Sequence, residues 1–308
     1  MQERPSEQAF TGCLLGLAMG DALGAPFEGG PLERGLWRVI GRTRDGRLRW
    51  TDDTQMSLDL CESLLSSGSI VEDDIARRFA QGYRWSRGYG PGAARVLKLI
   101  RRGVDWREAN TRVFREGSFG NGGAMRAPVI GLFYASQLDA IPQCARRSAS
   151  ITHAHPLGQE GAVLVALATA LALSDATPEE LLARLEAHAR HEPMRQRLSL
   201  AAAWISGQHP PHEEVRTQLG NGIAAAESCV TAIYVALRFI DDPFMDMLAF
   251  IAACRGDVDT IGAMAGAIWG ARNGEASLPA RELARVEATE RVARLARELH
   301  EAATGRVS

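Results

Sequence analysis

Apolar residues recur at helical spacing along almost the whole chain. Met56, Leu60 and Leu64, for example, are four residues apart, and residues at this spacing lie on one face of an α-helix. The strict alternation of apolar and polar residues that marks β-strands is almost absent. There is also no internal repeat and no low-complexity linker. The pattern therefore predicts an all-α protein that forms one compact domain over residues 1–308.

Helical patterns cover eleven stretches, and the last of them mixes Arg and Glu as a solvated surface helix does. The sequence predicts helices at 10–24, 55–66, 73–85, 93–102, 157–174, 178–190, 194–206, 243–254, 263–272 and 279–302, and an apolar helix that follows Leu219–Ile223 and ends at 239. Residues 31–49 are predicted to form a loop, which either meets phosphates or is solvated and mobile. Its arginines are Arg34, Arg38, Arg42, Arg44, Arg47 and Arg49.

The first predicted helix carries a row of glycines. Gly12, Gly16, Gly20 and Gly24 are four residues apart and share one helix face. Glycine destabilises a helix by about 1 kcal/mol relative to alanine, so four on one face need a structural reason. We expect the backbone of another element to approach this face closely.

Composition places the chain among ordinary globular proteins. It has 308 residues, of which 46% are hydrophobic and 23% charged, and its formal net charge is −2. This balance gives no general attraction to nucleic acid or to a membrane surface. We expect no apolar run long enough to span a membrane. Lys98 is the single lysine, so a Schiff-base mechanism would depend on that residue alone.

The cysteines are scattered, with no Cys-x-x-Cys pair, which indicates neither a disulfide framework nor a zinc site. We expect them to be buried free thiols. The first residues are polar and show no signal peptide, so a reducing, cytoplasmic setting is expected. The five cysteines are Cys13, Cys61, Cys144, Cys229 and Cys254.

Two acidic segments stand far apart in the sequence. Thr51-Asp52-Asp53-Thr54 precedes a helical pattern, and Asp257-Val258-Asp259-Thr260 lies near the other end of the chain. Adjacent carboxylates repel each other, and a shared cation relieves that repulsion. Carboxylate and hydroxyl oxygens are the ligands that Mg²⁺ takes, and two Mg²⁺ would balance four carboxylates.

Each acidic segment taken alone also fits a simpler interpretation. Aspartates at a helix start commonly cap the helix and complement its dipole. The presence of two matching segments favours metal binding over capping. The twelve-residue ligand pattern of a helix–loop–helix Ca²⁺ site is absent.

Three loops carry further candidate residues. Glu28 follows the first helix on a turn, where functional residues are common. The loop 86–92 is rich in glycine and precedes a helix, so its amides could bind an anion, and Tyr89 either contacts a ligand or packs. The loop 117–128 holds four glycines in seven residues, whose amides could line a pyrophosphate. Phe119 in this loop is either a buried anchor, which we favour, or a platform for a flat base.

His153-x-His155 separates two helices. The spacing could bind zinc, but no further zinc ligands cluster nearby. A histidine directed at a ligand phosphate is the functional alternative, and a structural or exposed side chain is the simpler one.

Taken together, these motifs resemble the ADP-ribosylglycohydrolase family. The matching stretches are Gly16–Glu28, Trp50–Thr54, Gly117–Pro128, Ile151–Gly158 and Gly256–Gly266, which span nearly the whole chain. Leu219–Tyr234 is similar to the branch that cleaves serine-linked ADP-ribose, poly(ADP-ribose) and O-acetyl-ADP-ribose, and less similar to the arginine-specific branch. The resemblance implies a single all-α orthogonal helical domain with a centre of two Mg²⁺, Mn²⁺ being the alternative ion.

The resemblance also assigns roles by position. Glu28 corresponds to a mobile glutamate that reaches a metal or acts as acid and base. The implied metal ligands are Thr51, Asp52, Asp53, Asp257, Asp259 and Thr260. The implied substrate contacts are Gly117, Ser118, Phe119, Gly120, Asn121, Gly122, Met125, His153 and Ile223, with Tyr89 added from its loop. Phe119, which stands where that branch often has Tyr, would stack on adenine, and His153 rather than His155 would face a phosphate.

The hypothesis is therefore a hydrolase that cleaves the bond at the anomeric carbon of ADP-ribose, with ADP-ribosylated proteins or metabolites as its partners. Glu28 would act as acid and base, and Asp52, Asp53 or Asp259 would orient or deprotonate water. Two alternatives remain open. One is an arginine-specific ADP-ribosylhydrolase, and the other is a non-catalytic relative that only binds ADP-ribose.

Overall fold

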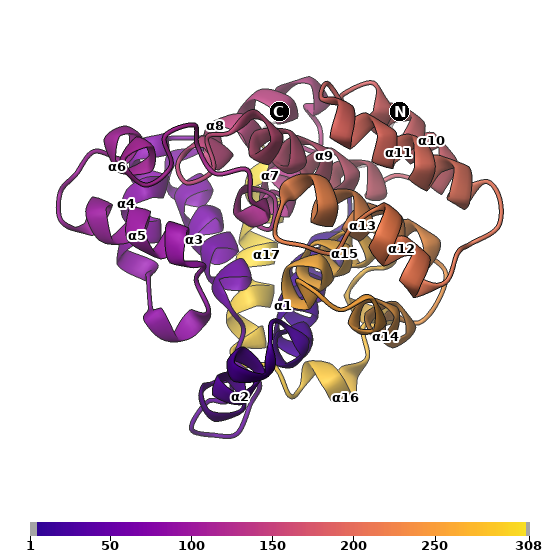
Figure 1. Cartoon of the computed structure of the whole chain (residues 1–308), viewed down its shortest axis with the longest axis horizontal. Helices are drawn as coiled ribbons and strands as arrows, with labels where there is room; N and C mark the ends of the chain where they lie inside the picture. The colour runs from indigo at the N-terminus through magenta and orange to yellow at the C-terminus, as the bar shows by residue number, and fades with distance from the viewer. Residues whose placement is uncertain (1–4, 306–308) are drawn as a thin grey trace.

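The computed structural model describes residues 5–305, apart from the side chains of residues 32 and 33. Within these residues the chain forms seventeen α-helices and no β-strand, which confirms the all-α prediction (Figure 1). The first nine helices are α1 (Glu7–Gly24), α2 (Pro31–Ile40), α3 (Asp52–Ser67), α4 (Glu72–Gly82), α5 (Pro91–Arg101), α6 (Trp106–Val113), α7 (Pro128–Phe133), α8 (Ile141–Ser150) and α9 (Pro156–Ala172).

The second half of the chain continues in the same way. Its helices are α10 (Pro178–Glu186), α11 (Glu192–Ile205), α12 (His212–Gln218), α13 (Ala225–Arg238), α14 (Phe244–Cys254), α15 (Val258–Asn273), α16 (Ala280–Leu283) and α17 (Thr289–Thr304). The short helices α6, α7 and α12 lie where the sequence pattern predicted none, and α8 is the helix that the sequence implied before His153 without giving its bounds. One continuous cluster of buried apolar side chains draws on helices from α1 to α17. All five cysteines are buried free thiols, as predicted.

The contact between α1 and α15 forms the centre of the molecule. The two helices run in opposite directions, with Gly16 facing Gly266 and Gly20 facing Gly262. A Cβ on Gly12, Gly16 or Gly20 would overlap backbone atoms of α15. The prediction that another backbone approaches this glycine face is therefore confirmed.

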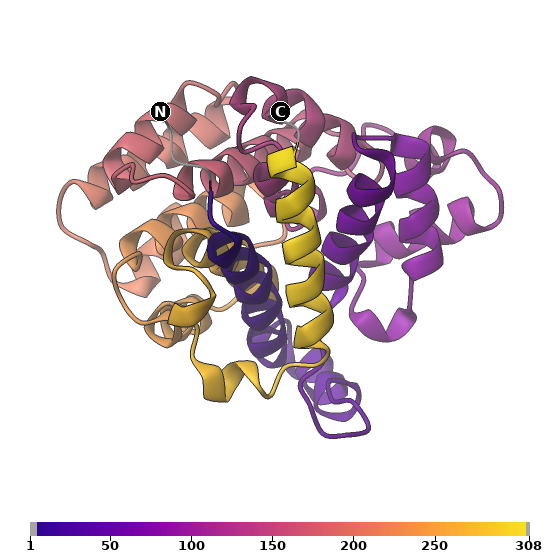
Figure 2. The same ribbon diagram turned by 180° about the vertical axis from the view of Figure 1, so that it is seen from behind.

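The last predicted helix is wrong in two respects. It is broken in two, because Ala288 takes a left-handed conformation (φ 45°) between α16 and α17. In addition, only one face of its longer part, α17, is solvated. α17 lies beside α1 (Figure 2) and buries Val292, Leu295 and Leu299. These residues form an apolar stripe at helical spacing between the Arg and Glu residues.

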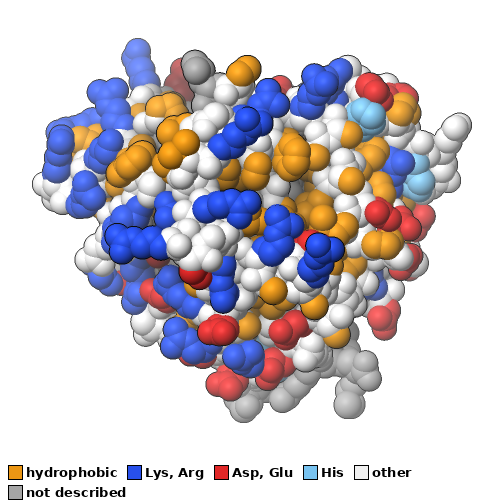
Figure 3. Space-filling model, turned by 90° about the horizontal axis from the view of Figure 1, so that it is seen from below, with side chains coloured by type: hydrophobic (Ala, Val, Ile, Leu, Met, Phe, Trp, Pro, Cys, Tyr) orange, Lys and Arg blue, Asp and Glu red, His pale blue; other side chains and the backbone are white. Residues whose placement is uncertain are grey.

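The arginine-rich stretch was predicted to be a loop, but its first part is the helix α2. Pro31 begins this helix, at a position where the missing N–H of proline has no helical partner to lose, and Trp37 is buried. Leu36 and Val39 are exposed, by 53% and 78%. α2 lies at the lower end of the molecule in Figure 1. Seen from below, the surface shows many basic side chains, nearly all of them arginine, with apolar side chains between them (Figure 3).

By length and composition alone, residues 7–27 could cross a membrane, which the sequence pattern did not predict. In the structure, however, 83% of the most apolar 18-residue window is buried inside the protein. Packing of α1 against α15 and α17 accounts for its apolar composition.

Candidate metal and substrate site

The two acidic segments line one cavity. Packing of α1 on α15 places the turn η1 (Ala25–Phe27) beside the start of α15, where a Cβ on Gly24 would lie 2.7 Å from the Cα of Asp259. The cavity has a volume of about 610 Å³. The acidic and hydroxyl residues that line it are Glu28, Asp52, Asp53, Asp257, Asp259 and Thr260.

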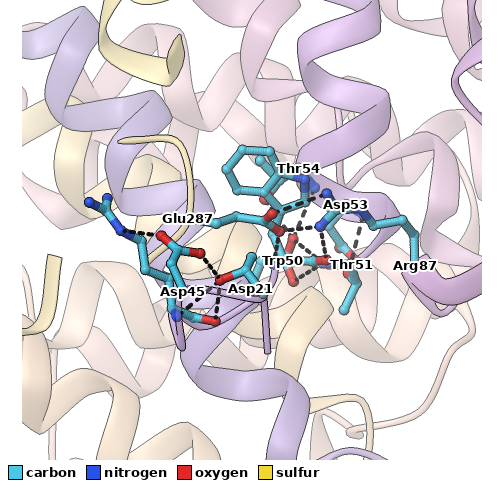
Figure 4. Close-up of polar contacts among 10 residues, drawn as sticks. Asp21, Asp45, Trp50, Thr51, Asp53, Thr54, Arg87 and Glu287 are labelled. Atoms are coloured by element: carbon cyan, nitrogen blue, oxygen red, sulfur yellow. Dashed lines mark hydrogen bonds and ion pairs between the residues drawn. The ribbon is translucent and has the colours of Figure 1, made fainter. Parts of the chain in front are cut away.

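Asp21 completes the acidic cluster, although the sequence reasoning did not select it. Its buried carboxylate accepts hydrogen bonds from the backbone N–H groups of Thr51 and Thr54 and from the Thr54 hydroxyl (Figure 4). Those N–H groups open α3, so Asp21 fixes the start of that helix and the direction of its two aspartates. The sequence did contain one signal for Asp21, because this residue directly follows Gly20 near the end of the helix that carries the glycine row.

A second network holds the same segment from the other side. The backbone N–H of Trp50 donates to Glu287 at 3.0 Å, and Arg87 donates to the carbonyl of Trp50 at 2.8 Å while pairing with Glu287 (Figure 4). The residue that leads into α3 is thus hydrogen-bonded to the segment just before α17. Both networks reduce the freedom of the first acidic segment.

Thr51 lies behind Asp53 rather than in the cavity wall. Its hydroxyl donates to Oδ2 of Asp53 at 2.8 Å and caps α3. Oδ1 of Asp53 is buried without a hydrogen-bond partner. In the structure Thr51 is the partner of a carboxylate, and the direct metal contact that the resemblance implies for it stays a prediction.

The carboxylates form two overlapping groups. Oxygen atoms of Asp21, Asp53 and Asp259 lie within 4.8 Å of one another, and so do those of Glu28, Asp257 and Asp259. Asp259 belongs to both. Each group offers hard oxygen donors, which suit Mg²⁺, Mn²⁺ or Ca²⁺. The residues present therefore fit a pair of neighbouring divalent cations.

The electrostatics of the cluster favour a positive partner. Burial, and then the charges of neighbouring carboxylates, raise the pKa of Asp52, Asp53 and Asp259 well above the ordinary range. Burial also raises the pKa of Asp21 to about 6. Buried charges of one sign are costly unless protons or cations neutralise them. The unpartnered oxygen of Asp53 is the clearest position for a cation.

Asp257 is held in place by two asparagines. The side chain of Asn121 donates to Oδ2 of Asp257 at 2.5 Å and to the Ser228 hydroxyl at 2.9 Å. The carbonyl of Asn221 accepts from the N–H of Asp257 at 2.8 Å, next to Gly256 with φ 79°. Asn121 was predicted as a substrate contact in the diphosphate loop. It lines the cavity, but its amide orients a carboxylate.

The glycine-rich loop pairs with the segment before α13. Asn121 N–H donates to the carbonyl of Ile223, and Ala225 N–H donates to that of Phe119, at 2.9 and 3.0 Å. Gly120 N–H donates to the Ser118 hydroxyl. Several amides of the loop are thus used within the protein and are not free to bind a diphosphate. They are those of Gly117, Gly120, Asn121, Ala124, Met125 and Ala127.

Phe119 and Ile223 stand together in the cavity lining as exposed apolar side chains, 55% and 69% accessible. The interpretation of Phe119 as a buried anchor is therefore wrong. The backbone pairing between 119–121 and 223–225 holds both residues in position. An exposed ring at this place is compatible with the role that the resemblance implies for Phe119, a platform for adenine.

His153 presents one defined nitrogen to the cavity. The Thr152 hydroxyl already accepts from Arg126 at 3.1 Å, so its own proton goes to Nδ1 of His153, 2.8 Å away. If Nδ1 of His153 carried the proton and donated it to Thr152, the buried hydroxyl proton of Thr152 would have no acceptor, which would cost about 1–3 kcal/mol. Burial, and next the charge of Arg126, lower the pKa of His153 to about 3. The ring is therefore neutral, and its Nε2–H lies beside Gly120 and Gly122.

His155 has a structural role. Its Nδ1 accepts from the N–H of Leu157 and caps α9, and its ring packs edge-on against Phe119. The metal-capable groups found among residues 5–305 include no histidine. These contacts give the His-x-His pair two separate functions, neither of them zinc binding.

Tyr89 does not line the cavity. Its side chain is 9% exposed and packs against Tyr83 with ring centroids 4.8 Å apart. The inward-turned ring favours the packing alternative for Tyr89, and a ligand contact by this residue stays a prediction. Its neighbours Gly88 and Gly90 do line the cavity.

Of the remaining predicted substrate contacts, most line the cavity and one does not. Gly117 (φ 82°) packs against the backbone of residues 154 and 155 and is not part of the lining. Arg95 lines the cavity but was not selected from the sequence, whereas none of the six arginines of 31–49 does so. The predicted contacts in the lining are Ser118, Phe119, Gly120, Asn121, Gly122, Met125, His153 and Ile223.

Comparison with known proteins identifies relatives over the full length of the chain. The model of the family described as ADP-ribosylglycohydrolase matches residues 2–307. The ADP-ribosylhydrolase ARH3 of Homo sapiens is 36% identical over 337 residues, covering 94% of this chain and 92% of that protein. The ADP-ribosylhydrolase ARH3 of Gallus gallus is 34% identical over 348 residues, covering 97% and 95%.

A solved structure described as an ADP-ribosylglycohydrolase-related protein complex superposes with a TM-score of 0.73 at 27% sequence identity. The match covers 96% of this chain and 98% of that one. The helical arrangement is thus shared over nearly the whole length of both chains.

Proposed function

The chain belongs to the ADP-ribosylglycohydrolase family and is a hydrolase that acts on ADP-ribose linkages; we propose that it uses two Mg²⁺ ions to release ADP-ribose from serine-linked ADP-ribose, poly(ADP-ribose) or O-acetyl-ADP-ribose. One observation carries the proposal. Carboxylates from the turn after η1, the start of α3 and the start of α15 meet in a cavity that also contains the glycine-rich loop and His153.

The cavity lining supports a position for each part of ADP-ribose. The exposed ring of Phe119, with Ile223 beside it, suits the adenine. The Nε2–H of His153, the amide-rich loop around Gly122 and the guanidinium of Arg95 suit the diphosphate. The distal ribose would then face the carboxylates.

The ions would be held by Asp53, Asp257 and Asp259, with Asp21, Asp52, Glu28 and Thr260 close by. Bound divalent ions at this place would polarise a water molecule and orient the ribose hydroxyls. The arrangement of Asn121, Asn221 and Thr51 keeps the carboxylate oxygens pointed into the cavity.

The protein's own groups account for the proton transfers. Cleavage at an anomeric carbon passes through an oxocarbenium-like state, helped by an acid at the leaving group and a base at the water. Glu28, on the turn after η1, would protonate the leaving oxygen of the acceptor. Asp52, Asp53 or Asp259 would accept the proton of the attacking water.

The test compares matched peptides that carry serine-linked or arginine-linked ADP-ribose, together with O-acetyl-ADP-ribose, in Mg²⁺ and in EDTA. We expect Mg²⁺-dependent hydrolysis of the serine-linked peptide and the ester, and a rate at least about 100-fold lower for Asp257→Asn. Asp139→Asn, an exposed position outside the cavity, is the matched control. Near-complete turnover by Asp257→Asn would contradict the proposal.

Two other outcomes correspond to the alternatives. Hydrolysis of the arginine-linked peptide alone would identify an arginine-specific ADP-ribosylhydrolase. Binding of ADP-ribose without turnover of any substrate would identify a non-catalytic relative. The second is disfavoured because Glu28 and all four aspartates of the acidic segments are present and line the cavity.

A further inference from the structure

A second cavity, of about 400 Å³, lies directly behind the turn that carries Glu28. It shares two chain segments with the first cavity, because Gly24, Pro26 and Phe27 line the second while Glu28 lines the first. At the start of α15 the side chains alternate in the same way. Val258 faces the second cavity, whereas Asp257 and Asp259 face the first. A thin wall of two backbone segments therefore separates the two.

The lining of the second cavity is apolar, with a basic rim. The apolar and small residues are Leu23, Gly24, Pro26, Phe27, Leu48, Met245, Leu248, Ala249, Ala252 and Val258. The two charged residues are Arg42 and Arg285, both exposed. Neither guanidinium forms an ion pair with a carboxylate of the described residues.

The two arginines have fixed backbones. Leu48 N–H donates to the carbonyl of Arg285 at 2.6 Å, and Glu287 N–H donates to that of Leu48 at 2.9 Å. Arg42 pairs with Leu48 in an isolated bridge and donates to the carbonyl of Gly46. This pairing holds two cations beside one apolar hollow. The lower face of the molecule shows this kind of surface, with apolar side chains between basic ones (Figure 3).

We propose that this cavity is a docking site for the acceptor polypeptide, and that it binds an apolar side chain flanked by acidic residues. The proposal rests on the proposed function, because it places the departing protein next to Glu28, the group that would protonate the leaving oxygen. Unpaired arginines beside apolar surface complement a segment of that composition. Phe27 and Met245 are exposed by 53% and 37%, so the hollow is open to a polypeptide.

The test separates protein recognition from chemistry. Three substrates are compared: a peptide with acidic residues on both sides of the ADP-ribosylated residue, the same peptide with Asn and Gln in their place, and O-acetyl-ADP-ribose, which has no polypeptide. The peptides carry whichever linkage the wild-type protein hydrolyses. We expect a lower KM for the acidic peptide than for the neutral one.

The double variant Arg42→Glu/Arg285→Glu should raise the KM for the acidic peptide about tenfold. It should leave kcat/KM for O-acetyl-ADP-ribose unchanged. Ala249→Trp, which fills the hollow without altering charge, should raise the KM for both peptides and not that for the ester. Arg184→Glu/Arg297→Glu is the matched control, because it makes the same charge change at two exposed positions on α10 and α17. It should not change the ratio of the KM values for the two peptides.

Two results would overturn the docking site and leave the proposed function standing. One is equal KM values of the wild-type protein for the two peptides. The other is a ratio of these KM values that Arg42→Glu/Arg285→Glu leaves unchanged. An equal loss on the ester would also overturn it, because the change would then act on the chemistry. Failure of the wild-type protein to hydrolyse any of the three substrates would refute the proposed function, and the docking site with it.

Discussion

Gly20 of α1 and Gly262 of α15 are in direct backbone contact, so that a Cβ on Gly20 would overlap the carbonyl oxygen of Gly262. This contact sets the distance between the two helices on which the acidic cluster depends. Asp21 follows Gly20, and Asp259 lies three residues before Gly262. The glycine face thus brings an acid of the first helix to the start of the second.

Gly20→Ala should destabilise the protein by about 3 kcal/mol, because the helices must separate to admit a methyl group. Chemical unfolding monitored by circular dichroism measures the change. Gly35→Ala is the matched control: Gly35 lies in α2, and a Cβ added to it would have no other atom within 4 Å, so it should stabilise the helix by up to about 1 kcal/mol. Equal stabilities for the two variants would show that the contact is not needed.

Sequence reasoning reached much of the fold and of the site. The spacing of apolar residues predicts most of the helices, and the glycine row predicts a close backbone contact. Asp52, Asp53, Asp257 and Asp259 are visible as acids at two helix starts. Their matching ligand sets suggested that the two segments meet at one metal site, and the resemblance supported this, although no local pattern states which helix starts meet in space.

The residues that sequence reasoning misplaced depend on tertiary packing. Asp21 reads as an ordinary acid at a helix end, and only the fold shows that it caps α3. Tyr89 and Phe119 are aromatic residues in similar glycine-rich loops, yet one is buried and the other exposed. Side-chain direction in a loop is set by the elements around it, which a single sequence does not specify.

Divalent ions should stabilise the protein through the buried carboxylates. At 100 times its dissociation constant, a single ion that binds only the folded state contributes about 2.7 kcal/mol. Mg²⁺ should therefore raise the melting temperature above its value in EDTA, as measured by differential scanning fluorimetry. Asp53→Asn should melt above the wild type in EDTA, because a repelling charge is removed, and should gain little from Mg²⁺.

Glu301→Gln, which removes an exposed charge from α17, should respond to Mg²⁺ as the wild type does. A full Mg²⁺ response in Asp53→Asn would show that this carboxylate does not bind the ion.

Thr152→Val should disturb the tautomer of His153. The valine keeps the shape but removes the hydroxyl that donates to Nδ1, so the Nε2–H form loses its preference. We expect ¹⁵N NMR to show a protonated Nε2 in the wild type and mixed tautomers in the variant. Affinity for ADP-ribose should fall about tenfold, and Thr152→Ser should restore both. A protonated Nδ1 in the wild type would contradict the assignment.

Asp59 should make stability depend on pH. Burial raises its pKa to about 7, against 3.8 for the ordinary side chain. Between these values the folded protein binds more protons than the unfolded chain, so stability is lost as pH rises from about 4 to 7. Asp59→Asn removes this loss and should be about 1–3 kcal/mol more stable than the wild type at pH 8.

Urea unfolding of both proteins at pH 5 and pH 8, with Mg²⁺ present throughout, measures the difference. The advantage of Asp59→Asn should shrink at pH 5. The same advantage at both values would assign the effect to packing and not to ionisation.

The central claim is that the segments at Asp52 and Asp257 jointly hold a pair of divalent ions beside the ADP-ribose cavity. An anomalous difference map from crystals grown with Mn²⁺ and ADP-ribose tests it most directly. We predict two peaks about 3.5–4 Å apart, one near Asp53 and one near Asp257, with Asp259 reaching both. Bound ADP-ribose with no anomalous peak between these carboxylates would contradict the account.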